Sequence, residues 1–195
     1  SIDAPEPFFG LAVTGEVEIA NIKRNDTAKD GDLIYLTKPL GVGILSTAQK
    51  RGKLKAEHEH IGPDLMVQLN RIGYDLGKYK NVSAMTDVTG FGLAGHLLEI
   101  CNGSGLSAEI EFDRIPVIPE ALIYVAEGCY PDGTLRNWKS YGEHITGADD
   151  MKRMLLLSDP QTSGGLMFTM AADHNLSELL IELGITDPIV RIGKM

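Results

Sequence analysis

The chain has 195 residues, 43% of them hydrophobic, and a formal net charge of −9 at neutral pH, so it can form one substantial core as a single compact domain. The negative charge and the lack of a long basic run argue against a nucleic-acid groove, because phosphate backbones are bound by clustered Lys and Arg. The apolar runs are far shorter than the roughly 20 residues that cross a bilayer, and no secretory signal opens the chain. We therefore expect a soluble cytoplasmic protein that binds neither nucleic acid nor membranes.

The first third of the chain is predicted to contain two strands and a helix. Residues 1–7, Ser-Ile-Asp-Ala-Pro-Glu-Pro, begin without an initiator Met and predict an extended segment in a piece of a longer protein. Residues 8–19 are rich in Phe, Val and Ile and predict a strand, and a polar turn over residues 25–32 separates it from a second strand over residues 33–37. The sequence Lys-Pro-Leu-Gly-Val-Gly then ends that strand, and a helix follows to about Gly52.

The middle of the chain is predicted to alternate helices with short strands. A helix opens at Gly-Pro (residues 62–63), and its one apolar stripe is formed by Leu65, Leu69, Ile72 and Leu76. Residues 82–88 predict a strand, and a glycine-rich turn joins it to a helix with apolar side chains at i, i+4 and i+7. Residues 106–112 predict a further strand, and residues 119–128 predict a short helix.

The last third begins with the segment that is hardest to assign. Residues 129–150 show no clear period and predict a long loop, a kind of segment that is often functional. A helix over residues 151–157 follows, with Asp149 or Asp150 as its cap. A second glycine-bearing turn then leads into a strand over residues 166–170.

A capped helix and a strand complete the predicted order of elements. Asn175 and Glu178 have the spacing of a capping box, and residues 189–192 predict the last strand. Strands interleaved with helices predict an α/β domain in which one sheet is covered by helices.

The sequence Thr-Asp-Val-Thr-Gly-Phe-Gly-Leu-Ala-Gly-His over residues 86–96 is the main candidate for a functional site. It places the Asp87 carboxylate at the end of a predicted strand and Thr89, Gly90 and Gly92 near the start of a predicted helix. Unpaired backbone N–H groups and the positive end of that helix would attract an anion. Asp87 would repel the anion unless a cation lies between them, and Mg²⁺ commonly binds one or two carboxylates together with phosphate oxygens. The motif therefore predicts a site for a magnesium-bound phosphate.

Two other interpretations of this motif remain open. Residues 90–95 match the dinucleotide fingerprint GxGxxG, and Glu111 or Asp113 could be the ribose-binding acid, although Pro116 and Pro119 interrupt the expected second βα unit. In a purely structural alternative, the glycines allow close packing and Asp87 is a turn or cap residue.

Two further glycine-bearing segments, residues 133–142 and 158–165, accompany the motif. If all three lie at one edge of the sheet, their N–H groups and hydroxyls form a cleft that suits a phosphorylated ligand. Arg136 is the only guanidinium among them, and it either holds a phosphate or carboxylate or forms a surface ion pair. His96 is interpreted as a packing or helix-orienting residue rather than as a general base.

The remaining candidates indicate no separate site. The sequence Glu-His-Glu-His at residues 57–60 is interpreted as a solvated turn, because its i, i+2 spacing suits a metal poorly. Cys101 and Cys129 lack CxxC spacing and predict buried or free thiols in a reducing compartment. The sequence contains no P-loop, no nucleophile elbow and no HExxH motif.

Three of these segments together resemble the C-terminal part of the selenophosphate synthetases, the selenide, water dikinase family. They are residues 86–96, the pair Gly-Thr-Leu-Arg-Asn and Ser-Tyr-Gly within residues 133–142, and Asp-Pro-Gln-Thr-Ser-Gly-Gly-Leu over residues 159–166. Residues 1–7 and 37–43 match as well, so the resemblance covers nearly the whole chain. The wider superfamily includes aminoimidazole ribonucleotide synthetase, thiamine-monophosphate kinase and a hydrogenase-maturation dehydratase, all of which use ATP.

The resemblance implies a reaction in which ATP, selenide and water give selenophosphate, orthophosphate and AMP. It implies ATP and Mg²⁺ as cofactors, ATP and selenide as substrates, and a homodimer for the full-length protein. Asp87 is expected to help bind Mg²⁺. Ser1, which matches the last residue of a Gly-His-Ser segment, is expected to touch ATP across the dimer, and Thr89, Gly90 and Gly92 are expected beside the nucleotide.

The chain also departs from the family. The reactive Cys or selenocysteine, its partner lysine, a glycine-rich segment and further metal-binding aspartates would all lie upstream of Ser1, and neither Cys101 nor Cys129 matches the reactive position. The family also continues beyond the last residue of this chain. We therefore expect residues 1–16 to be a linker or strand that follows a missing ATP-binding domain, and residues 17–195 to be the C-terminal domain, a mixed sheet packed against helices. Alone, the chain is expected to be inactive.

Overall fold

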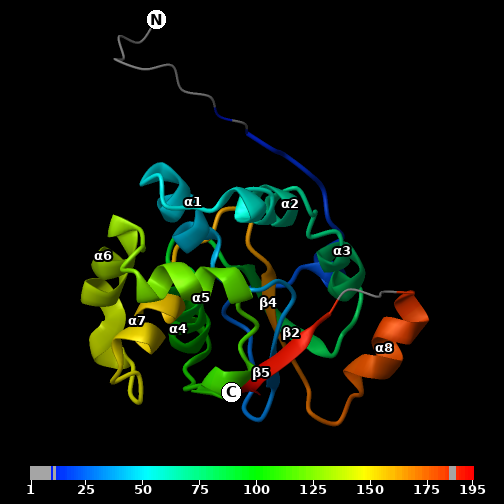
Figure 1. Cartoon of the computed structure of the whole chain (residues 1–195). Coiled ribbons are helices and arrows are strands. Elements are labelled where there is room, and N and C mark those ends of the chain that lie inside the picture. The colour runs from blue at the N-terminus through cyan, green and yellow to red at the C-terminus, as the bar shows by residue number, and fades with distance from the viewer. Residues whose placement is uncertain (1–9, 11, 185–187) are drawn as a thin grey trace, which may run out of the picture.

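The computed structural model describes residues 10, 12–184 and 188–195, and its centre is a five-stranded β-sheet (Figure 1). The strands lie in the order β2-β4-β1-β5-β3, and every neighbouring pair is antiparallel. Their bounds are β1 (Leu33–Leu36), β2 (Val82–Asp87), β3 (Glu109–Ile110), β4 (Leu166–Met170) and β5 (Val190–Lys194). Parallel pairing is limited, in the described part of the chain, to an isolated bridge between Leu40 and Val117. The predicted fold class, one sheet packed against helices, is confirmed, but the sheet is antiparallel where a mixed sheet was predicted.

The described residues form eight α-helices, of which α4 to α7 stand to one side of the strands and α8 to the other (Figure 1). They are α1 (Val42–Lys50), α2 (Ile61–Met66), α3 (Ile72–Gly77), α4 (Gly92–Ser104), α5 (Pro119–Ala126), α6 (Asp132–Tyr141), α7 (Met151–Leu157) and α8 (Leu176–Leu183). None of these helices is long and apolar enough to cross a membrane.

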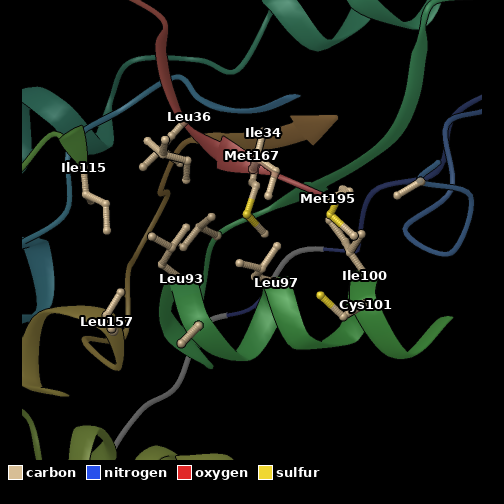
Figure 2. Packing of buried hydrophobic residues seen from close by; sticks show 14 of the residues in the cluster. Ile34, Leu36, Leu93, Leu97, Ile100, Cys101, Ile115, Leu157, Met167 and Met195 are labelled. Atoms are coloured by element: carbon tan, nitrogen blue, oxygen red, sulfur yellow. The ribbon is translucent and has the colours of Figure 1, made fainter. Parts of the chain in front are cut away.

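Successive side chains of a strand point to opposite faces of a sheet. In this sheet, apolar clusters cover both faces. Ile34 and Leu36 of β1 pack in one cluster with Leu93 of α4 (Figure 2). Tyr35 points the other way, stacks on Phe168 with 5.2 Å between ring centroids, and shares a second cluster with α8. A third cluster joins α1, α5 and α7. Helix α4 is therefore fixed against the sheet directly after the glycine-rich turn, and this packing positions the turn at the end of β2.

Most of the predicted elements and both predicted N-cap residues are confirmed, although Glu178 accepts from the Asn175 side chain rather than from its backbone N–H as in a capping box. The Asp150 carboxylate accepts a hydrogen bond from the Arg153 N–H at 2.8 Å and caps α7, and the Asn175 side chain accepts from the Ser177 N–H at 3.0 Å and caps α8. Both cysteines are buried and free. The strand predicted over residues 106–112 is shorter, because only the two residues of β3 pair with β5 before a 3₁₀ turn begins.

The strand predicted over residues 8–19 is wrong where it can be compared. Residues 10 and 12–18 form no strand, and Val13 and Val17 are 92% and 61% exposed. Alternating apolar residues form a stable strand only where another strand supplies hydrogen bonds and a buried face, and this segment has neither. Residues 8, 9 and 11 of the prediction, like residues 1–7, lie outside the described residues.

The single helix predicted after Gly62 is also wrong. Two short helices, α2 and α3, are separated by residues 67–71, and Leu69 from the predicted apolar stripe is 85% exposed. The break has a tertiary cause, because the intervening residues bind the loop before β4 and Lys38, which follows β1. Asn70 Nδ2 donates to the Gly164 carbonyl at 2.8 Å, and Lys38 Nζ donates to the Gln68 carbonyl at 2.6 Å.

The long loop predicted over residues 129–150 contains helix α6. Its buried side contains Thr134, Trp138 and Tyr141, which have the i, i+4, i+7 spacing of a helix. Thr134 is fully buried although it is polar, and this polar residue at the first position, together with Gly133, concealed the period.

Candidate functional site

The glycine-rich turn after β2 lies directly against the loop before β4. The Gln161 N–H donates to the Thr89 carbonyl at 2.9 Å, and the Val88 N–H donates to the Gly165 carbonyl at 2.8 Å. Two of the three glycine-bearing segments therefore lie together, joined by backbone hydrogen bonds.

Helix α6 brings the third segment to the same place. Asn137 Nδ2 donates to the Gly90 carbonyl at 2.8 Å and to the Ser158 carbonyl at 3.2 Å, so one amide joins both loops. The Tyr141 hydroxyl donates to the Phe91 carbonyl at 2.6 Å. The side chains of α6 thus fix the backbone of both loops. The sequence analysis predicted a loop over these residues and therefore missed this role.

Asp87 ends β2 opposite Leu166, and it is exposed. Its carboxylate forms no hydrogen bond or ion pair with the residues that the structure describes. Those residues also contain no group of three or more His, Cys, Asp or Glu that could hold a metal ion. An exposed, unpaired carboxylate beside a polar loop suits one ligand of a hydrated Mg²⁺, whose other ligands would be water and phosphate oxygens.

Thr89 and His96 form a hydrogen-bonded pair across the first turn of α4. Thr89 Oγ1 lies 3.2 Å from His96 Nε2, and His96 Nδ1 lies 3.0 Å from a carboxylate oxygen of Glu99. His96 is 7% exposed. The ring therefore holds the turn against the helix, as the helix-orienting interpretation expects.

The two glycines of the turn have different surroundings. Gly92 has φ +70°, and a Cβ at this position would lie 2.8 Å from the Ser158 carbonyl carbon. The Gly92 N–H already donates to the Thr89 carbonyl at 3.1 Å. Gly90 is exposed, and a Cβ there would meet nothing within 4 Å. Glycine is thus required at residue 92 by conformation and packing, whereas the surface at residue 90 is open to a ligand.

The dinucleotide interpretation is contradicted by the topology. A dinucleotide site requires two adjacent parallel strands joined through the glycine-bearing helix. Here β2 and β3 lie at opposite edges of the sheet, and all five described strands pair antiparallel.

The remaining candidates make no contact with the meeting point of the loops among the described residues, or lie outside those residues. Arg136 is exposed and forms no ion pair with the described residues. His58 Nδ1 lies 2.6 Å from the Tyr124 hydroxyl, so one residue of the Glu-His-Glu-His segment anchors it to α5. Ser1 lies outside the described residues.

Asp159 is a buried carboxyl that the sequence analysis did not single out. It is fully buried, and one of its oxygens accepts from Gln161 Nε2 at 2.7 Å. The other oxygen faces the first turn of α1 near the N–H groups of Gly43 and Ile44, which favour the ionised form without a full hydrogen bond. Burial nevertheless dominates and raises the pKa of Asp159 to about 7. The signal available in the sequence was the position of this acidic residue between a predicted helix and a predicted apolar strand.

This carboxyl predicts a pH-dependent stability. Because the pKa of Asp159 is about 7 in the folded chain and 3.8 ordinarily, the folded state holds a proton that the unfolded state releases between these values. The stabilisation is therefore complete below about pH 4 and is lost as the pH rises through about 7. Asp159→Asn should flatten this part of the pH dependence of the free energy of unfolding, measured by denaturant titration at several pH values. An unchanged pH dependence in the variant would show that Asp159 stays ionised.

The comparisons with known proteins agree with this fold. The family model described as "AIR synthase related protein, C-terminal domain" matches residues 29–195. Thiamine-monophosphate kinase from Stenotrophomonas maltophilia K279a has a similar structure, with a TM-score of 0.61 and 22% identity over 91% of this chain and 51% of that chain. A structure of hydrogenase maturation protein HypE in complex with ATP has a TM-score of 0.61 and 19% identity over 92% of this chain and 47% of the other. At these identities the likeness shows the fold alone.

Curated relatives are much closer in sequence. The chain is 56% identical over 188 residues to the selenide, water dikinase of Aeromonas hydrophila subsp. hydrophila, which is 95% of this chain and 54% of that protein. It is also 56% identical over 173 residues to the selenide, water dikinase of Shewanella sp. strain MR-4, covering 89% of this chain and 49% of that protein. The chain thus spans about half the length of these relatives. It belongs to the AIR synthase related family, of which it carries the C-terminal domain.

Proposed function

We propose that this chain is the C-terminal part of an ATP-dependent selenophosphate synthetase, which converts ATP, selenide and water to selenophosphate, orthophosphate and AMP. The observation that carries the proposal is the 56% identity, over 95% of the chain, to a relative named selenide, water dikinase. The ATP complex of hydrogenase maturation protein HypE, a protein of the same fold, supports the use of ATP.

The part of this chain in the reaction is to complete a Mg²⁺–ATP site. Phosphoryl transfer depends on placing charges around the phosphates, and Mg²⁺ neutralises their negative charge. Asp87 is the carboxylate that would hold the cation, and Thr89 and Gly90 line the turn beside it. Gly92 shapes this turn, because its own N–H is used inside the turn. Ser1 remains a predicted nucleotide contact across a homodimer.

Two alternatives belong to the same proposal. The chain could come from another ATP-using member of the superfamily, or it could be a module that serves only packing and dimer formation. The close packing of Gly92 on Ser158 favours a structural role for part of the motif. We retain residues 1–16 as a linker or strand, residues 17–195 as the C-terminal domain, and a cytoplasmic location as predictions.

Activity should require more than this chain. We expect no selenide-dependent ATP consumption by residues 1–195 alone, and clear consumption when the chain is extended to the length of its curated relatives, because one carboxylate and one turn supply only part of the charge that phosphoryl transfer needs. Phosphorus NMR would identify selenophosphate, and thiamine monophosphate in place of selenide tests the superfamily alternative. An extended chain that phosphorylates thiamine monophosphate but not selenide would overturn the assignment.

A further inference from the structure

In the loop over residues 161–165, the last three carbonyl groups accept hydrogen bonds from other parts of the chain. The Ser163 carbonyl accepts from Lys38 Nζ at 2.9 Å, the Gly164 carbonyl from Asn70 Nδ2 at 2.8 Å, and the Gly165 carbonyl from the Val88 N–H at 2.8 Å. Three consecutive peptide oxygens are thus fixed by donors from three other parts of the chain.

The peptide N–H groups of this loop are not used in the same way. None of the N–H groups of residues 162–165 donates a hydrogen bond to a described residue. Gly164 and Gly165 are buried, and nearly all buried N–H groups in proteins find a partner. Thr162 and Ser163 are exposed. Ser163 has φ +51° and is, among the described residues, the only one other than glycine with a positive φ. Such a conformation persists where its surroundings impose it, and the Ser163 carbonyl is held by Lys38.

Lys38 supplies a buried positive charge behind the same loop. The residue is 6% exposed, and its ammonium group donates to two carbonyl oxygens, those of Gln68 and Ser163. No carboxylate forms an ion pair with it in the described part of the chain. Lysine is almost never buried to this degree without an anionic partner. Two independent features, unpaired N–H donors and an uncompensated buried cation, therefore favour an anion at this place.

The position of the loop identifies the class of anion. Residue 166, which follows the loop, pairs with Asp87 at the end of β2. An anion on the loop would therefore lie beside the carboxylate that we assign to Mg²⁺. A cation-bound phosphate resolves the repulsion between them.

We propose that the N–H groups of residues 162–165, backed by Lys38, form a binding site for a phosphate group. This inference rests on the proposed function for the identity of the phosphate, which is either part of the nucleotide or the orthophosphate that the reaction releases. It adds a second group of donors to the glycine-rich turn after β2.

The test uses the enzyme at the full length of its relatives and compares Thr162→Glu with Thr162→Gln. The exposed Thr162 side chain forms no hydrogen bond with the described residues, so both variants should fold with similar melting temperatures. A carboxylate there would compete with a bound phosphate, and like-charge repulsion at this range should weaken binding by about tenfold or more relative to the Gln variant, which adds similar bulk without the charge. Calorimetric titration with orthophosphate and, separately, with Mg²⁺–ATP gives the two affinities.

Weakening of orthophosphate binding alone would assign the site to the released product, and weakening of Mg²⁺–ATP binding would assign it to the nucleotide. Equal affinities of the Glu and Gln variants for both ligands would refute the site. Lys38→Met, which removes the charge and keeps the length, should lower the same affinity, with the melting temperature measured in parallel. Assay of the unmodified enzyme with selenide separates the two claims: if it makes no selenophosphate, the proposed function fails, while the phosphate titrations still test the site.

Discussion

Replacing Asp87 with Asn in the full-length enzyme should lower selenophosphate formation by on the order of 100-fold or more, because an amide keeps the size of the carboxylate but removes the charge that a hard cation needs. The fold should survive, since the side chain is exposed at a strand end and has no partner among the described residues. Raising the Mg²⁺ concentration should recover part of the lost activity.

Asp173→Asn is a suitable control for this substitution. Asp173 is exposed and lies in the turn that follows β4, at the opposite end of that strand from Leu166 and Asp87. Its loss should leave turnover and Mg²⁺ dependence unchanged. If Asp87→Asn retained normal turnover at limiting Mg²⁺, Asp87 would be a structural residue.

Gly92→Ala should lower the free energy of unfolding by about 3 kcal/mol, because the variant combines a strained backbone with overpacking. Gly92 has φ +70°, and a Cβ would lie 2.8 to 2.9 Å from backbone atoms of Leu157 and Ser158. Backbone cannot move aside as a flexible side chain can. Denaturant titration of the 195-residue chain measures the effect directly.

Gly90→Ala is the matched control, since a Cβ there meets no atom within 4 Å and φ is not positive. Its stability should stay within about 1 kcal/mol of the parent. In the full-length enzyme, weaker nucleotide binding by Gly90→Ala at unchanged stability would place the phosphate at the turn itself. Equal stability of the Gly90 and Gly92 variants would contradict the packing account.

Local patterns predicted the elements whose cause is local. The strands at residues 33–36 and 166–170 are short apolar runs between turns, and the caps at Asp150 and Asn175 depend on side chains only a few residues away. The failures have a tertiary cause. The apolar stripe through Leu69 is broken because Asn70 and the Gln68 carbonyl bind partners more than 25 residues away in sequence.

The sequence pointed to the segments of the candidate site but not to how they pack against each other. Segment chemistry indicated what the turn after β2 and the loop before β4 would form if they lay together, and left open whether they do. The sequence could not show that Gly92 packs against the backbone of Leu157 and Ser158, because these residues are far from it along the chain. The same limit applies to Gly95. From the sequence alone, an alanine in this helix would be acceptable, but a Cβ at residue 95 would lie 2.6 Å from the Phe91 Cβ and 2.9 Å from the Tyr141 ring. The buried ionisable groups of Lys38 and Asp159 likewise become evident only from burial and partners.

The most direct test of the central claim, that this chain completes the metal-bound phosphate site, is a crystal structure of the full-length enzyme with a non-hydrolysable ATP analogue and Mn²⁺ in place of Mg²⁺. The anomalous signal of manganese locates the cation without assumptions about the protein. We expect a peak about 2.1 Å from an Asp87 carboxylate oxygen, with phosphate oxygens among its other ligands. Manganese held entirely by the other half of the enzyme, with Asp87 neither in its coordination sphere nor hydrogen-bonded to its waters, would contradict the account.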